Sequence, residues 1–183
     1  IYRGVLTGCN EAFIISTAKR DEILANCQTE EERKRTEELI RPILRGRDIK
    51  KYGYVENGLF LINTHNGIRG KLPRIDINDY PAVKAHLDRY WDKISARADK
   101  GDTPYNLRNC AYLEDFNNPK IIYPDICTFL SFELDTSCFY LSNTAYFLIT
   151  EKEEHLKYFL RVLNSSVMDW YYRTLSVQLG EKA

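Results

Sequence analysis

The 183-residue sequence lacks the short motifs that mark many enzymes and metal-binding proteins. It contains no Cys-x-x-Cys or His-x-x-x-His pair, no P-loop, no Gly-x-Ser-x-Gly elbow and no Gly-x-Gly-x-x-Gly turn. These absences exclude the usual signatures of zinc ribbons, zinc proteases, nucleotide-binding enzymes and serine hydrolases. We therefore expect this chain to hold no metal and no cofactor, and to have no catalytic residues of its own.

Long apolar runs and a disulfide pattern are missing as well. No stretch approaches the roughly 20 apolar residues that cross a bilayer, so we expect no membrane contact. The cysteines are odd in number and widely spaced, which favours reduced, mostly buried thiols in a cytoplasmic protein. They are Cys9, Cys27, Cys110, Cys127 and Cys138.

A net charge is also missing, because 26 basic residues balance 26 acidic ones. The basic residues are nevertheless concentrated: residues 33–51 hold eight basic and three acidic side chains, and residues 66–110 hold nine and six. A one-sided basic surface built from these stretches would suit a phosphate backbone. Charge alone leaves a second interpretation open, in which the stretches are solvated helix faces with paired charges.

Apolar residues at helical spacing predict several helices. We expect one over residues 19–27, one that begins at Thr29 and ends or kinks at Pro42, one that begins near Pro81, and one at the C-terminus. The apolar stripe of the third comprises Val83, Leu87, Tyr90, Trp91, Ile94 and Ala98. That of the last comprises Leu156, Phe159, Leu160, Leu163, Val167, Trp170 and Tyr171.

Runs of β-branched and aromatic residues predict strands between these helices. We expect strands over residues 3–7, 12–16 and 58–63, and a strand-rich block within 120–150. No repeat or linker forces a domain boundary. The pattern predicts a mixed α/β (α+β) fold, with one mixed sheet, flanking helices and a single domain over residues 1–183.

Seven segments occur in an informative order along the chain. They are residues 3–13, 39–49, 80–83 followed by Leu87, Arg97 followed by 105–108, 119–126, 139–141 and 163–166. In this order they resemble the TaqI-like C-terminal specificity domain, the target recognition domain of type IIG restriction–modification enzymes and adenine-specific DNA methyltransferases. One departure is Pro104, where the resemblance would place a tryptophan, so a local packing contact differs.

The resemblance implies a fold similar to the recognition domains of type I specificity subunits. It also implies that this chain is an excised C-terminal part of a larger bacterial enzyme. That parent protein would carry an S-adenosylmethionine-dependent adenine methyltransferase domain and, as an open alternative, a nuclease domain. The implied partners are double-stranded DNA, read in the major groove while the catalytic domain flips an adenine, and the methyltransferase domain of the same polypeptide.

Residues in or beside the expected turns supply most of our candidate DNA contacts. Base edges are read by forked donors and amides, whereas phosphates accept any well-placed cation or hydroxyl. The candidates for base reading are Asn66, Arg69, Lys71 and Arg108. The candidates for phosphate contact are Arg45, Arg47, Lys93, Arg97 and Lys120. The alternative for each cation is a plain surface charge, and Arg47 has the further alternative of a structural ion pair with Asp48.

Three hypotheses follow. The first is a non-catalytic, sequence-specific reader of duplex DNA, and the second is a protein-interaction module that docks onto a methyltransferase partner without DNA affinity of its own. The third is an enzyme with an unrecognised active site, which is disfavoured because the carboxylates of Asp125 and Glu133 have no lysine near them in residues 121–151. Steeply salt-dependent DNA affinity would favour the first, and metal-dependent cleavage the third.

Overall fold

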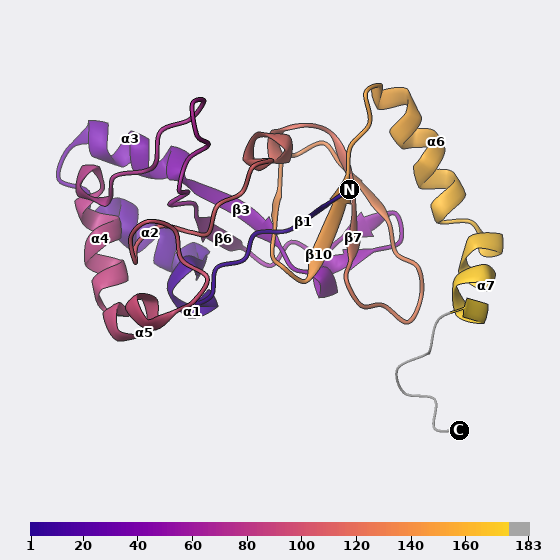
Figure 1. Cartoon of the computed structure of the whole chain (residues 1–183), viewed down its shortest axis with the longest axis horizontal. Coiled ribbons are helices and arrows are strands. Elements are labelled where there is room, and N and C mark those ends of the chain that lie inside the picture. The colour runs from indigo at the N-terminus through magenta and orange to yellow at the C-terminus, as the bar shows by residue number, and fades with distance from the viewer. Residues whose placement is uncertain (176–183) are drawn as a thin grey trace. The chain divides into compact units, whose positions relative to one another are not determined.

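The computed structural model describes residues 1–175, and its mixture of helices and strands confirms the α/β (α+β) class (Figure 1). The chain forms two compact units. Unit 1 comprises Ile1–Gly4, Leu44–Asn57 and Glu114–Ala183, and unit 2 comprises Val5–Ile43 and Gly58–Leu113. The single recognition domain over the whole chain stays a prediction. None of the described helices is both long and apolar enough to cross a membrane.

Unit 2 is built around a short antiparallel sheet. Its strand β6 (Leu59–Ile62) pairs with β2 (Ile14–Ser16) on one side and with β3 (Ile40–Leu44) on the other. Leu61 lies opposite Ile14, Ile62 lies opposite Ile40, and the two β6 residues are fully buried. This strand confirms the prediction made for residues 58–63.

Helices complete unit 2, and side chains at their ends hold them in place. The Thr29 hydroxyl caps one helix by accepting from the Glu32 N–H at 3.1 Å. The buried Glu32 carboxylate accepts from the N–H groups of Gln28 at 2.9 Å and of Ala82 at 3.0 Å, which ties two helix starts together. The helices are α1 (Asn10–Phe13), α2 (Thr17–Ala25), α3 (Glu30–Leu39), α4 (Pro81–Asp88) and α5 (Trp91–Ala96), with the 3-10 turn η2 (Ile77–Asp79).

Several expected boundaries in unit 2 were wrong. Helix α3 ends before Pro42, which lies in β3 opposite Phe60, because a residue that precedes proline disfavours the helical conformation. The strand expected over residues 12–16 begins only at Ile14, after the turn of helix α1. The helix expected from Pro81 is broken at Tyr90, so Trp91 is exposed instead of lying in the apolar stripe.

Unit 1 contains a second antiparallel sheet, whose strand order is β1-β10-β7-β8, so the expectation of one mixed sheet was wrong. Of the first expected strand, residues 3–7, only Arg3 joins this sheet, because β1 covers Tyr2–Arg3 and residues 4–7 form no strand of two or more residues. The other strands are β10 (Ala145–Leu148), β7 (Lys120–Pro124) and β8 (Glu133–Asp135). The shorter elements are η1 (Gly46–Asp48), β4 (Ile49–Lys50), β5 (Gly53–Tyr54), η3 (Leu113–Asn117) and β9 (Tyr140–Leu141).

The C-terminal helix of the sequence prediction is divided into α6 (Glu153–Leu163) and α7 (Ser166–Leu175), drawn in orange and yellow in Figure 1. Leu156 of α6 packs with Ile121 of β7 and with Phe132, which directly precedes β8. The break follows from Asn164, whose amide donates to the Phe132 carbonyl at 2.8 Å and accepts from its N–H at 3.1 Å. Part of the expected apolar seam is consequently exposed on α7.

The five cysteines all lie within the described residues and form no disulfides. Each cysteine is partly buried. Their distribution over both units matches their wide spacing in the sequence.

Candidate nucleic-acid interface

Residues 66–74, here called the 66–74 loop, lie in the connection between β6 and η2. The loop closes on itself, because Ile68 and Leu72 exchange backbone hydrogen bonds of 2.8 and 2.9 Å. Gly70 at its tip has a φ of +74°, in the left-handed region that favours glycine. The side chains of Arg69 and Lys71, on either side of this glycine, are exposed.

A second glycine lets the two arms of the loop approach each other. A Cβ atom at Gly67 would lie 2.5 Å from the Leu72 carbonyl oxygen and 2.7 Å from the Arg74 amide nitrogen, closer than real side chains come. Gly67 also has a left-handed φ of +75°. The backbone within residues 66–74 therefore sets the shape of the loop.

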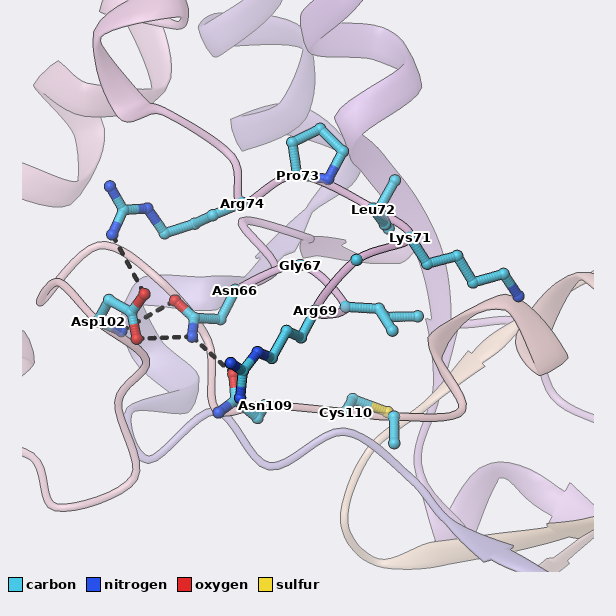
Figure 2. A pocket seen from close by; sticks show the side chains of 13 residues that line it. Asn66, Gly67, Arg69, Lys71, Leu72, Pro73, Arg74, Asp102, Asn109 and Cys110 are labelled. Atoms are coloured by element: carbon cyan, nitrogen blue, oxygen red, sulfur yellow. Dashed lines mark hydrogen bonds and ion pairs between the residues drawn. The ribbon is translucent and has the colours of Figure 1, made fainter.

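A cavity of about 860 Å³ lies against the loop (Figure 2). Its wall comprises residues 66–74, Asp102 and residues 109–111, all of which belong to unit 2. The cavity brings together Asn66, Arg69 and Lys71, three of the four candidates for base reading. Its volume lies within the range that is usual for ligand-binding pockets.

Asn66 is held inside a chain of hydrogen bonds. Its Nδ2 group donates to Asp102 Oδ1 at 3.0 Å and to Asn109 Oδ1 at 2.6 Å, as the dashed lines of Figure 2 show. Its Oδ1 accepts from the Asp102 N–H at 2.9 Å. Arg74 contacts the other oxygen of Asp102 at 3.3 Å. Both N–H groups and the oxygen of the Asn66 amide are thus already used.

Arg69 and Asn109 differ from Asn66 in how far their hydrogen-bonding groups are used. Both are exposed and line the cavity. Within residues 1–175, no residue makes a hydrogen bond or an ion pair with the Arg69 guanidinium, and none accepts from Nδ2 of Asn109. A guanidinium is a planar fork of donors, and an amide NH₂ adds two more. The cavity therefore presents unused hydrogen-bond donors at its surface.

The remaining base candidate and one phosphate candidate form exposed ion pairs. Arg108 is not part of the cavity wall, and its Nη1 lies 3.2 Å from Asp99 Oδ1. Lys93 bonds to Glu11, and this hydrogen bond raises the pKa of the lysine. Exposed pairs of this kind contribute only about 0–1 kcal/mol. A phosphate or a base can replace such a carboxylate at little cost.

Arg97 lies inside unit 2, with 7% of its surface exposed. Burial lowers the pKa of its guanidinium. The guanidinium donates to the carbonyl oxygens of Thr7, Asp99, Pro104 and Asn106. Because its Nη donors are used and the whole side chain is enclosed, we leave Arg97 out of the phosphate contacts that we propose.

At the turn of η1 in unit 1, Arg45 forms the ion pair that the sequence suggested for Arg47. Its Nε and Nη2 atoms each lie 2.9 Å from an oxygen of Asp48, and its N–H donates to the same carboxylate at 2.9 Å. Burial raises the pKa of Asp48, but the hydrogen bonds from Arg45, together with the charges of Arg45 and Arg47, outweigh it and hold the pKa below its ordinary value. Arg47 itself is exposed.

Lys120 is fully buried, which argues against contact with a phosphate. Its Nζ atom lies 2.6 Å from Asp135 Oδ2 and 2.7 Å from the Phe116 carbonyl oxygen. Asp135 also accepts from the N–H groups of Ser137 at 2.8 Å and Phe139 at 3.0 Å. The pair stabilises the fold of unit 1.

The sequence interpretation missed Asp102 and Asn109. They lie 36 and 43 residues from Asn66 along the chain, so no local pattern relates the three. The one available signal was the position of Asn109 directly after Arg108, in a loop rich in glycine, proline and asparagine. That signal does not identify the residue to which Asn109 is hydrogen-bonded.

No curated protein matches the chain. The model of the TaqI-like C-terminal specificity domain matches residues 41–182, which include the 66–74 loop, Asp102 and Asn109. The chain therefore belongs to the TaqI-like C-terminal specificity domain family, whose role is target recognition in restriction–modification enzymes.

Proposed function

We propose that the chain is a sequence-specific duplex-DNA recognition domain of a bacterial restriction–modification enzyme. It would position a target adenine for an N6-adenine methyltransferase domain outside residues 1–183, and the parent protein would use S-adenosylmethionine. Membership of the family supports target recognition. The observation that carries DNA recognition is the exposed Arg69 guanidinium in the cavity wall, which has no partner among the described residues.

The chemistry of base reading supports this assignment. In the major groove an arginine fork matches O6 and N7 of guanine, and such a pair contributes about 1–3 kcal/mol of discrimination. Arg69, Lys71 and Arg108 stay as proposed base contacts, because all three are exposed. Arg47 and Lys93 stay as proposed phosphate contacts for the same reason, and Arg45 is a weaker choice because Asp48 occupies its fork.

Duplex binding at increasing salt tests the proposal. Three phosphate contacts would weaken binding roughly 40-fold between about 50 and about 200 mM salt, because each contact releases condensed counterions. Arg33→Ala is a matched control for Arg69→Ala, since both arginines are exposed in unit 2 and Arg33 does not line the cavity. Absence of duplex binding at low salt would contradict the proposal.

One observation favours a second candidate, the docking module. Val167, Trp170, Tyr171 and Leu175 share one face of α7, and between 50% and 69% of each is exposed. An apolar stripe of this kind suits contact with another protein surface. Binding to a methyltransferase domain that persists at high salt, without any duplex affinity of the chain, would support this candidate over the first.

A further inference from the structure

We propose that Asn66 is a positioning residue that turns the donor side of the Asn109 amide toward the cavity, and that the cavity thereby selects guanine over adenine. The inference rests on the proposed DNA-recognition function. It changes the role of Asn66 from base contact to holder, and it assigns a base contact to Asn109.

The orientation of the Asn66 amide is fixed by Asp102. The Asp102 N–H must meet an acceptor, and it lies 2.9 Å from Asn66 Oδ1. The Asp102 carboxylate must meet a donor, and its Oδ1 lies 3.0 Å from Asn66 Nδ2. A reversed amide would place donor against donor and acceptor against acceptor. The amide is also packed closely, since a Cβ atom at Gly101 would lie 2.5 Å from Asn66 Oδ1.

The orientation of Asn109 follows from that of Asn66. The second N–H of Asn66 points to Asn109 and requires an acceptor there, which is Oδ1 at 2.6 Å. Reversing Asn109 would bring two NH₂ groups together. Its own NH₂ group is therefore the part of the amide that is left for a ligand. Figure 2 shows Asn66 between Asp102 and Asn109 in this chain of contacts.

The resulting surface discriminates between the two purines. Guanine offers two acceptors in the major groove, N7 and O6, whereas adenine offers the acceptor N7 and the donor N6. Arg69 and Asn109 both present donors to the cavity. An asparagine that reads adenine needs its oxygen to accept from N6, and here the Asn66 N–H already donates to that oxygen and competes with N6 for it. The amino group of adenine would face a donor.

The test uses the whole chain. Selection from a pool of duplexes that carry a randomised site first identifies the preferred sequence. The affinities for pairs of duplexes that differ at one base pair are then measured. Asn109→Asp keeps the shape and still accepts from Asn66, but it replaces the donors by acceptors. We expect this variant to prefer cytosine where the unaltered chain prefers guanine, because a carboxylate accepts from the cytosine amino group. The ratio of the affinities for the two bases should change by at least about tenfold.

A second variant separates positioning from stability. Asn66→Ala releases Asn109 to rotate, so we expect the guanine-to-adenine affinity ratio to fall about tenfold at that same position. A merely structural role would weaken all duplexes alike and leave the ratio unchanged. Asn78→Ala is the matched control, because Asn78 is an exposed asparagine of unit 2 outside the cavity wall.

Each outcome decides between the two proposals. A guanine preference in the unaltered chain that both substitutions change supports the inference. A base preference that survives Asn109→Asp unchanged overturns the inference and leaves DNA recognition standing. A chain that binds every duplex equally, or none, overturns DNA recognition and the inference with it. A preferred adenine at the position that responds to Asn109 also overturns the inference.

Discussion

The Nζ atom of Lys120 lies 2.6 Å from Oδ2 of Asp135, and neither side chain is exposed to solvent. The neighbours of the pair also use its remaining hydrogen-bonding groups, through the Phe116 carbonyl and the Phe139 N–H. A buried charge of this kind is tolerated only while its partner is present. The pair therefore matters for the stability of the fold.

Lys120→Met should lower the free energy of unfolding by about 3–5 kcal/mol, because it leaves Asp135 as an uncompensated buried charge. Urea unfolding measures this loss. Lys157→Met is the matched control, since Lys157 is exposed and lies 3.9 Å from Glu153 on α6. It should change stability by no more than about 1 kcal/mol. Equal effects of the two substitutions would show that the buried pair is unimportant.

Arg97→Lys should destabilise the chain by about 2–3 kcal/mol, even though the charge is kept. An ammonium cannot reproduce a planar fork that serves four carbonyl oxygens, and hydrogen bonds to charged groups contribute about 1.5–3 kcal/mol each. Urea unfolding and duplex binding are measured on the same preparation. Reduced DNA affinity at unchanged stability would restore Arg97 as a phosphate contact.

The stability of unit 2 should fall as the pH drops below about 6.5, the ordinary value for histidine. Burial lowers the pKa of His86, although the bond between its Nε2 and the Ala12 carbonyl, 3.0 Å long, acts in the opposite sense. The unfolded chain therefore takes up a proton first, and stability is lost from about pH 6.5 down to the lower pKa of the folded state. Burial lowers the pKa of His65 as well, which adds a contribution of the same sign.

Thermal unfolding between pH 8 and pH 5 checks this dependence. His86→Gln keeps a donor for the Ala12 carbonyl and cannot take up the proton. We expect its melting temperature to vary less with pH than that of the unaltered chain, with the contribution of His65 still present. An equal variation in the two proteins would remove His86 as the cause.

Arg69→Ala should relax base preference by about 1–3 kcal/mol at one position, as the loss of a forked contact predicts. Arg108→Ala should do the same at a different position. Lys93→Ala should instead weaken binding to all sequences equally, because a phosphate contact carries no sequence information. Selection from a randomised duplex pool measures all three. If Lys93→Ala changes the preferred site, the division between base and phosphate contacts is wrong.

Local chemistry explains what could be read from the sequence. Thr29 before three glutamates predicted a helix start, and the structure shows the Thr29 hydroxyl capping α3. The apolar run that became β6 was equally clear. Residues whose role depends on distant partners could not be assigned. Lys120 resembles a surface cation until Asp135 is seen beside it, and Asn66 resembles a base reader until Asp102 and Asn109 are seen.

The backbone of the 66–74 loop keeps its shape independently of the side chains at its tip. Because Gly67 and the exchange of bonds between Ile68 and Leu72 maintain its outline, the side chains at 69 and 71 can be replaced with little effect on folding. A small library that varies these two positions, with Gly67 and Asn66 left intact, would explore new target sites on an unaltered scaffold. Under the proposed function, substitutions at these two positions would change the recognised sequence without rebuilding the protein.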